Sequence, residues 1–217
     1  MTAQKTLKID FVSDVACPWC AIGLQSLETA LERVKDEVRV ELHVQPFQLN
    51  PDMPPEGEDI VEHLSRKYGM SAEQVHANQQ AIAQRGVEVG FEFRMDKRGR
   101  TWNTFDAHRL LHWAGLQGRE VALKHALLSA YFTAGENPGD HEVLVRRAVE
   151  AGLDGPAARA MLASNEFVDE VRARLRHWVE AGIHSVPSII INDRHLIQGG
   201  QPPEVFERAL RRLAEEA

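Results

Sequence analysis

The sequence predicts an α/β fold that is interrupted by a large inserted helical domain. Two stretches of alternating apolar and polar residues, 5–13 and 38–44, flank a segment with helical periodicity. Two further strand-like stretches, 186–191 and 195–197, lie near the other end of the chain. Between them, residues 48–164 carry mostly helical signals. The predicted order is therefore β-α-β, a helical block, and then α-β-β-α.

The first unit of this order is a strand, a helix and a second strand. Apolar residues alternate with polar ones through Leu7, Ile9 and Phe11, which indicates a strand. The leucines between residues 24 and 31 recur at helical spacing, and alternation returns at 38–44. A strand–helix–strand unit of this kind normally has parallel strands and a right-handed crossover.

The middle of the chain shows helical periodicity in several separate stretches. A Pro-rich connector, residues 50–57, leads into it. Ser71 and Gln74 have the spacing of a capping box at the start of a helix. Residues 87–93 alternate, which fits a short strand or an extended loop. Helices are predicted near residues 59–68, 72–85, 104–116, 119–133, 141–151 and 156–163.

The last part of the chain returns to an α/β pattern. Asn165 is placed to cap a long helix, and Gly182 is placed to end it. Asn192-Asp193 predicts a turn between the two C-terminal strands. Pro202-Pro203 starts a final helix.

The chain is predicted to form two domains: residues 1–47 and 165–217 make the α/β domain, and residues 48–164 make an inserted all-helical domain.

The composition is typical of a soluble globular protein with a sizeable core: the chain has 217 residues, of which 43% are hydrophobic and 26% are charged. The net charge of −7 argues against nucleic-acid binding. The sequence has no long apolar run and no apolar leader. We therefore expect no membrane partner, and we expect a cytoplasmic location. The oligomeric state stays open.

The two cysteines, Cys17 and Cys20, are three residues apart. A structural disulfide closing so short a loop would stabilise the fold by only about 2 kcal/mol. A structural zinc site needs four ligands, and a lone CxxC supplies two. His108 and His112, four residues apart on a predicted helix, could supply the two missing ligands of such a site. We expect no metal and keep a metal-binding module as a minor alternative.

Thiol chemistry explains the spacing better, because Cys17 follows a strand and begins a helix. The positive end of a helix lowers the pKa of a cysteine there. We therefore predict that Cys17 is the attacking thiol and that Cys20, one turn further, is the resolving thiol. Trp19 offers an apolar contact to substrate, or packs on the helix surface. Asp14 is either a supporting polar group for the thiols or a strand-end residue that bonds the backbone.

Pro187 is the second indication of function. A proline at the start of an apolar strand cannot donate a ladder hydrogen bond. A cis Val186–Pro187 bond beside the dithiol would leave the Val186 backbone free to pair with substrate. His184 precedes this segment and is a candidate for a supporting role near the thiols.

Several motifs together resemble the DsbA/FrnE-like family of the thioredoxin superfamily, and the resemblance covers nearly the whole chain. It implies a thioredoxin-like fold with a helical insertion and a protein-disulfide oxidoreductase or isomerase. The matching segments are Ser13-Asp14-Val15, Cys17-Pro18-Trp19-Cys20, Gln48-Leu49-Asn50-Pro51-Asp52-Met53-Pro54-Pro55-Glu56-Gly57, Asn103-Thr104, Ala107-His108-Arg109-Leu110, Ser185-Val186-Pro187 and Gly199-Gly200-Gln201.

The resemblance also implies roles for individual residues. Cys17 and Cys20 would be the redox pair, Pro187 the cis-proline, and protein thiols or glutathione the partners, with no cofactor besides the redox-active disulfide. The related glutathione-dependent isomerases and kappa-class transferases usually have serine at the first of the two positions; that activity is the alternative. Thioredoxins often carry a buried acid six residues before the attacking cysteine, where this chain has Phe11. Proton transfer from Cys20 would then rely on water or on another residue.

Overall fold

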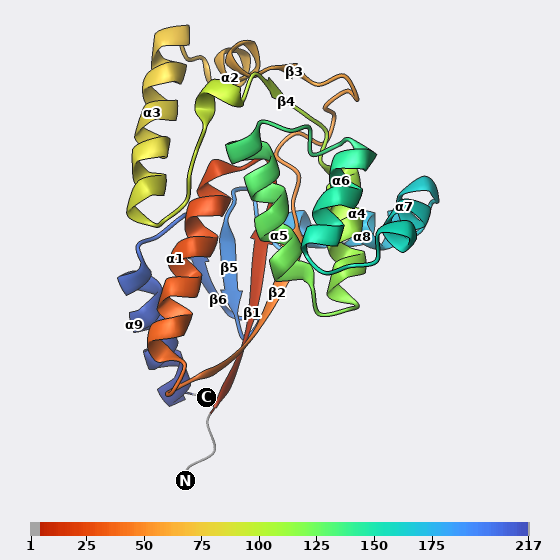
Figure 1. Ribbon diagram of the computed structural model, residues 1–217. Helices are drawn as coiled ribbons and strands as arrows, with labels where there is room; N and C mark the ends of the chain where they lie inside the picture. Colours follow the sequence, from red (N-terminus) through yellow and green to blue (C-terminus); the bar gives the residue numbers. More distant parts are fainter. Residues whose placement is uncertain (1–4, 217) are drawn as a thin grey trace.

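The structure is a computed structural model that describes residues 5–216, and it has the thioredoxin-like fold with a helical insertion (Figure 1). Its main sheet has the strand order β2-β1-β5-β6. Strand β1 runs parallel to β2 and antiparallel to β5, and β6 pairs antiparallel with β5. The four strands are β1 (Thr6–Ser13), β2 (Arg39–Pro46), β5 (Ser188–Ile191) and β6 (His195–Gln198).

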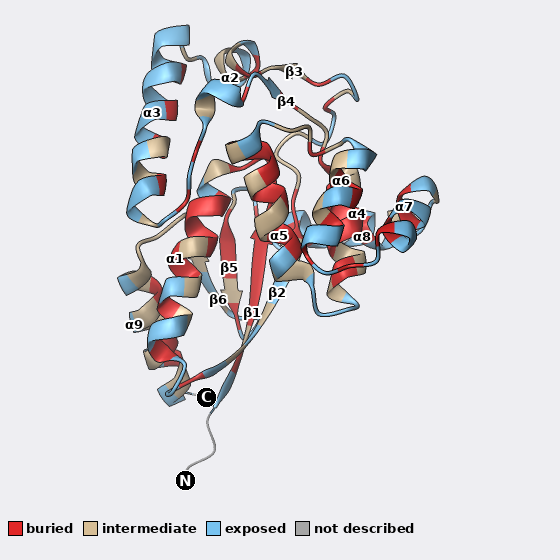
Figure 2. Cartoon of the chain, viewed as in Figure 1, coloured by how far each residue is buried: buried red, intermediate tan, exposed pale blue. Residues whose placement is uncertain are grey.

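Helices cover both faces of this sheet. On one face α1 (Pro18–Val34) and α9 (Pro203–Glu216) pack together, and their apolar side chains share a core with those of β1 and β5. On the other face Trp178 of α8 (Val168–Glu180) packs with Val12 of β1. Figure 2 shows the result, in which β1 and the inner side of α1 are largely buried while α3 is mostly exposed.

The segment between β2 and α8 is helical apart from a two-stranded ribbon. The ribbon pairs β3 (Glu58–Asp59) with β4 (Arg100–Thr101). The helical elements are α2 (Ile60–Tyr68), α3 (Ala72–Glu88), η1 (Met95–Lys97), α4 (Phe105–Gly115), α5 (Glu120–Ser129), the π-helical turn η2 (Ala130–Ala134), α6 (His141–Glu150) and α7 (Gly155–Ala163). Aromatic residues of this segment, Phe93 and Phe132 among them, belong to the same core cluster as β1 and α1. The division at residues 48 and 164 stays a prediction.

Local signals in the sequence explain several element boundaries. Ser71 and Gln74 form the predicted capping box at the start of α3. Asn192 and Asp193 both have positive φ, as the predicted turn between β5 and β6 requires. The prediction that Asn165 caps α8 is wrong, because the helix begins at Val168 and the preceding residue, Phe167, takes a left-handed conformation.

Of the two alternatives predicted for residues 87–93, the strand is wrong and the loop is correct for residues 91–93. Helix α3 continues to Glu88, and the chain then runs without regular structure to η1. Phe91 and Phe93 point into the core from this loop, with ring centroids 4.6 Å apart. The alternation therefore reflects burial of two aromatic rings rather than a strand.

Within residues 5–216, no helix combines the length and apolar character that crossing a bilayer would need.

Candidate active site

The two cysteines lie at the start of α1, shortly after the end of β1. Cys17 is the N-cap residue, with extended backbone angles, and Pro18 occupies the first helical turn, where its missing N–H leaves no bond unmade. The Cys20 amide donates to the Cys17 carbonyl at 3.1 Å, closing the first turn. Cys17 is 3% exposed and Cys20 is fully buried, and both are free thiols. A surface hollow is lined by Cys17 and not by Cys20.

The two thiols differ in their acidity. A hydrogen bond from the Cys20 side chain lowers the pKa of Cys17, against the opposing effect of burial, and backbone amides of the first helical turn add to the lowering. Burial raises the pKa of Cys20 well above its ordinary value, and the neighbouring Cys17 raises it further. Cys17 is therefore the thiol that is more readily ionised, and Cys20 is held protonated.

The far end of the chain comes to the dithiol through Val186 and Pro187. The peptide bond between them is cis, and the Cys17 Sγ donates to the Val186 carbonyl at 3.5 Å. Helix α1 can approach this loop because residue 23 is glycine: a Cβ there would lie 2.9 Å from Cγ of Pro187. The sequence-predicted site residues Cys17, Val186 and Pro187 are thus brought together from opposite ends of the chain.

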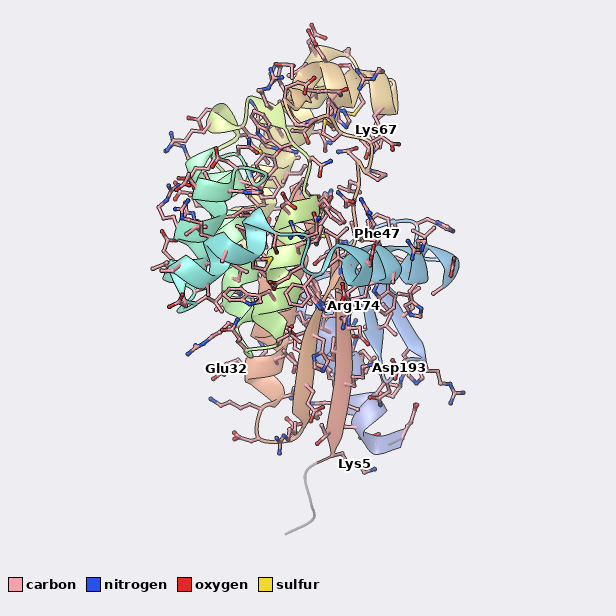
Figure 3. The ribbon with its side chains drawn as sticks, turned by 90° about the vertical axis from the view of Figure 1, so that its right-hand side faces the viewer. Lys5, Glu32, Phe47, Lys67, Arg174 and Asp193 are labelled. Atoms are coloured by element: carbon pink, nitrogen blue, oxygen red, sulfur yellow. The ribbon has the colours of Figure 1, made fainter. Side chains whose placement is uncertain are left out.

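A hollow of about 560 Å³ opens in front of Cys17. Trp19, 41% exposed, and His184 and Val186 line one part of it. Residues of the helical insertion, including Lys67 of α2, line another part. Figure 3 places Lys67 toward the end of the molecule that lies opposite Lys5. The hollow therefore lies between the two parts of the chain, with the Cys17 thiol in its wall.

Known proteins show the same architecture. The DSBA-like thioredoxin domain family matches residues 8–211. The chain belongs to this family. The DsbA-like chain is 31% identical over 207 residues to the uncharacterised protein YwbO of Bacillus subtilis (strain 168), with 94% of this chain and 96% of YwbO covered.

Two solved structures illustrate the range of this likeness. The probable DsbA oxidoreductase SCO1869 from Streptomyces coelicolor superposes with a TM-score of 0.88 at 34% identity, covering 97% of this chain and 91% of that one. The cytosolic disulfide reductase DsbM from Pseudomonas aeruginosa, solved with GSH, has a TM-score of 0.64 at 17% identity, covering 96% and 99%. The second comparison shows the shared fold alone.

Asp14 of this DsbA-like chain is fully buried behind the dithiol. Its carboxylate accepts hydrogen bonds from the Leu49 amide at 2.8 Å, the Ala16 amide at 3.4 Å and the His108 Nε2 at 3.2 Å. Burial opposes ionisation, but the hydrogen bonds from His108 and Leu49 prevail and hold the pKa of Asp14 below its usual range. Burial lowers the pKa of His108, so its imidazole is neutral and donates to the Asp14 carboxylate.

The sequence analysis missed Lys124. This residue lies on α5, is fully buried, and its Nζ has no hydrogen-bond partner among the described residues. Its charge interacts with Cys20, Asp14 and Cys17. One signal could have revealed it: Lys124 occupies the apolar stripe that continues through Leu127 and Leu128, where a lysine is out of place.

Residues 5–216 contain no group of three or more His, Cys, Asp or Glu side chains that could hold a metal ion. The two histidines considered as zinc ligands make other contacts. His108 bonds Asp14 at 3.2 Å, and the His112 ring packs on Phe167 with centroids 5.0 Å apart. Nothing in this arrangement favours the metal-binding alternative.

Proposed function

We propose that the chain exchanges disulfides with protein or small thiol substrates through Cys17 and Cys20. The supporting observation is the asymmetry of the pair: Cys17 has a lowered pKa and lines the hollow, while Cys20 is sealed behind it with a raised pKa. The Cys17 thiolate attacks a substrate disulfide, forming a mixed disulfide and releasing one substrate thiolate. Cys20 then attacks the Cys17 sulfur, closing the enzyme disulfide and releasing the second thiolate.

Val186 and Trp19 fit the role of substrate contacts in this scheme. The Val186 carbonyl is directed at the Cys17 sulfur, so a substrate chain bound to Cys17 would run past this backbone. Trp19 presents a partly exposed apolar surface beside the thiol. Pro187, which has no N–H, leaves the backbone before β5 without a donor of its own. His184 lies in the wall of the same hollow and is proposed as a supporting polar contact.

Glutathione is proposed as one small-thiol partner, because the fold neighbour DsbM was solved with GSH. That neighbour is a cytosolic disulfide reductase, which also supports the proposal of a cytoplasmic location. In a compartment buffered by glutathione the pair would be largely reduced, so the proposed direction of flow is reduction of substrate disulfides.

Trapping of intermediates tests this function. Cys20→Ser, incubated with a disulfide-bonded peptide or with glutathione disulfide, should accumulate a mixed disulfide through Cys17 that mass spectrometry identifies. Cys17→Ser serves as the matched control and should form none. Trapping through Cys20 instead would reverse the assignment, and glutathione binding without disulfide turnover would favour the isomerase or transferase alternative.

A further inference from the structure

The hollow in front of Cys17 has an unusual charge for this chain. Two of its lining residues, Lys67 and Arg98, are cationic, and His63 and His184 add two imidazoles. None of the described residues that line it is Asp or Glu. The chain as a whole has 32 acidic residues against 25 lysines and arginines, so a cavity without a single acid departs from its average.

Arg98 is the most deeply placed of these cations, with only 7% of its surface exposed. Its Nε donates to the Tyr131 hydroxyl at 2.9 Å, and its guanidinium carbon lies 5.0 Å from the Tyr131 ring centroid and 5.1 Å from that of Phe132. Within residues 5–216 it has no carboxylate partner, unlike the buried Arg109, which pairs with Asp106. A desolvated guanidinium without a counter-ion is costly unless an anion binds there.

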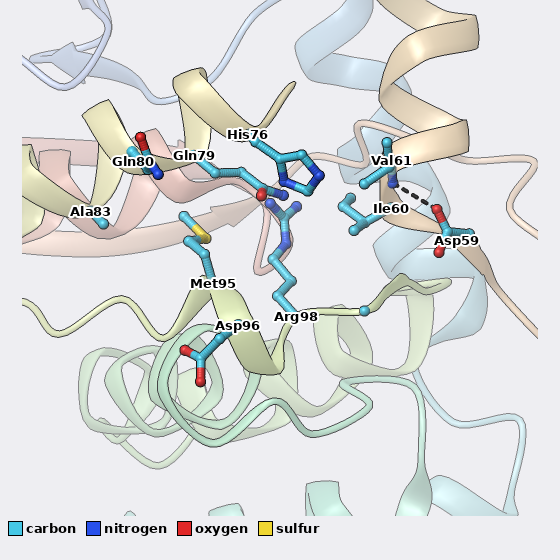
Figure 4. A pocket seen from close by; sticks show the side chains of 11 residues that line it. Asp59, Ile60, Val61, His76, Gln79, Gln80, Ala83, Met95, Asp96 and Arg98 are labelled. Atoms are coloured by element: carbon cyan, nitrogen blue, oxygen red, sulfur yellow. Dashed lines mark hydrogen bonds between the residues drawn. The ribbon is translucent and has the colours of Figure 1, made fainter. Parts of the chain in front are cut away.

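A second hollow of about 530 Å³ lies beyond Arg98 and shares Ile60, Gln79 and Arg98 with the first. In Figure 4 the Arg98 guanidinium is directed toward the side chains of Gln79 and His76. Asp59 and Asp96 also line this second hollow.

The two aspartates of the second hollow already have partners. The Asp59 carboxylate accepts from the Val61 and Glu62 amides at 2.9 and 3.0 Å, capping α2, and Asp96 pairs with Arg94 at 2.8 Å. The Arg98 guanidinium therefore forms no ion pair with either aspartate of the second hollow.

Lys67 provides a second cation in the dithiol hollow. Its Nζ donates to the Leu49 carbonyl at 2.8 Å and to the Asn50 Oδ1 at 2.7 Å, and both of these partners are neutral. No described carboxylate forms an ion pair with it. The wall that faces Cys17 thus holds two positive charges that form no ion pair with a carboxylate of the described residues.

We infer that the substrate of this site is a disulfide or thiol carrying carboxylates, which Lys67 and Arg98 bind while its sulfur reaches Cys17. This inference rests on the proposed disulfide exchange and specifies its substrate class. The planar guanidinium of Arg98 can hold a carboxylate through two parallel hydrogen bonds, and the ammonium of Lys67 can hold a second one.

The test uses three small disulfides of similar length that differ in charge: 3,3′-dithiodipropionate (anionic), bis(2-hydroxyethyl) disulfide (neutral) and cystamine (cationic). With the native chain, kcat/KM should fall in that order, with roughly a tenfold step from anionic to neutral. Equal values for the three would overturn the inference while leaving disulfide exchange intact. Turnover of none of the three, nor of any peptide disulfide, would instead contradict the proposed function.

A matched pair of variants locates the effect. Arg98→Gln should lower kcat/KM for the anionic disulfide about tenfold more than for the neutral one. Arg94→Gln removes a charge from the same loop outside the dithiol hollow, and should keep the native preference. If a folded Arg98→Gln variant kept the native preference for the anionic disulfide, Arg98 would not be part of the binding site. If that variant does not fold, the three-substrate series with the native chain still decides the substrate class.

A second, independent observation concerns the proton of Cys20. Lys124 is fully buried with an unpartnered Nζ, and α5 carries it along α1, where the next residue, His125, contacts Glu28 at 2.8 Å. The titratable groups that interact with Lys124 are Cys20 of α1, Cys17 at its N-cap, Asp14 from the β1–α1 loop and His108 of α4. A buried amino group without any hydrogen-bond partner among the described residues is costly to the fold, which calls for a functional reason.

We propose that Lys124 is the proton acceptor for Cys20 when the mixed disulfide is resolved, directly or through one water. The neutral amine takes the Cys20 proton and becomes an ammonium; the Cys20 thiolate forms a bond to the Cys17 sulfur; the bond from Cys17 to the substrate sulfur breaks, and a substrate thiolate leaves. Burial lowers the pKa of Lys124, which favours the neutral amine this step requires. Asp14 is the poorer acceptor because its carboxylate already receives three hydrogen bonds.

The test follows resolution of a preformed Cys17 mixed disulfide as a function of pH. Lys124→Met should slow resolution roughly 10- to 100-fold near pH 7, with the rate rising steeply toward alkaline pH as hydroxide replaces the lysine. Lys124→Arg keeps the charge but has no accessible neutral form, so it should not restore the rate.

A control separates this role from a structural one. Ser26→Ala removes another unpartnered buried polar group, the hydroxyl on α1, and should leave the resolution rate unchanged. Lys124→Met should also be at least as thermally stable as the native chain, because it replaces a buried amine without a hydrogen-bond partner by an apolar side chain. A native rate and pH profile in Lys124→Met, or full rescue by Lys124→Arg, would overturn the proposal.

Discussion

The two sides of the dithiol differ in both charge and access. On the outer side, Cys17 faces a hollow whose cations, Lys67 and Arg98, have no carboxylate partners within the described chain. On the inner side, Cys20 faces a sealed interior with Lys124 and an Asp14 that is tied to hydrogen-bond donors. In the proposed mechanism the outer side meets the substrate, whereas the inner side governs where protons reside. The difference indicates that attack on substrate, proposed for Cys17, and proton transfer, proposed for Cys20, take place in separate environments only one helical turn apart.

The largest expected consequence is unequal reactivity of the two thiols. In the reduced native protein, iodoacetamide should modify Cys17 at neutral pH at least roughly 100-fold faster than Cys20, because the pKa of Cys17 is lowered and that of Cys20 is raised by burial. Peptide mapping after timed alkylation measures both rates. The Cys17 profile should have its midpoint below the free value of about 8.5.

Denaturant provides the control for this comparison, since both cysteines should react alike once the chain is unfolded. Comparable rates for Cys17 and Cys20 in the native state would show that the two sides do not differ as the geometry indicates.

The next effect concerns Asp14 on the inner side. Asp14→Asn removes a carboxylate that accepts three hydrogen bonds, and should lower the free energy of unfolding by about 1–3 kcal/mol. The negative charge of Asp14 raises the pKa of Cys17, so the variant should also show a lower Cys17 pKa. Denaturant titration and the alkylation profile measure the two results.

Asp10→Asn is the matched control for this variant. Asp10 is also buried, but it pairs with Lys8 at 3.0 Å and accepts from Gln45 at 2.6 Å, away from the thiols. It should change stability without changing the Cys17 pKa. An equal Cys17 shift in both variants would argue against a local effect of Asp14.

A smaller effect is expected from His108 as the pH falls. Burial lowers its pKa in the folded state, so the unfolded chain takes up this proton first. Its stabilising contribution is complete above the unfolded value of about 6.5 and is lost as the pH falls from there toward the folded pKa, by up to about 1.4 kcal/mol per pH unit.

His108→Gln keeps a donor for Asp14 but cannot titrate. Its free energy of unfolding should therefore decline less than that of the native chain between pH 6.5 and 5. Parallel declines in the two proteins would show that His108 is not held neutral.

The sequence predicted the outer side of the site better than the inner side. Cys17 and Cys20 are three residues apart, so their meeting at a helix start follows from local patterns alone. Pro187 was found because a proline at the start of an apolar strand is a local anomaly. The alternation of β1 and β2 likewise predicted two strands that do pair in parallel.

The inner side depends on contacts that no local pattern encodes. Lys124 meets Cys20 only because α5 of the insertion packs beside α1, and the sequence does not specify that packing. His108 was read as a possible metal ligand because its spacing to His112 is local, while its bond to Asp14 joins residues far apart in the chain. The absence of acids around Lys67 and Arg98 also emerges only after folding.

The smallest expected effect lies at the outer rim, at Trp19. With 41% of its surface exposed, its side chain contributes little to the core, so Trp19→Ala should change the free energy of unfolding by less than about 1 kcal/mol. If its ring contacts bound substrate, KM for a peptide disulfide should rise a few-fold while kcat stays near the native value, since the thiols themselves are untouched. Steady-state kinetics separates the two constants. Leu116→Ala, the truncation of a more exposed apolar side chain at the end of α4 and outside the hollow, should leave both unchanged. A fall in kcat with an unchanged KM would instead mean that Trp19 acts on the thiol chemistry, and that the outer side is not only a binding surface.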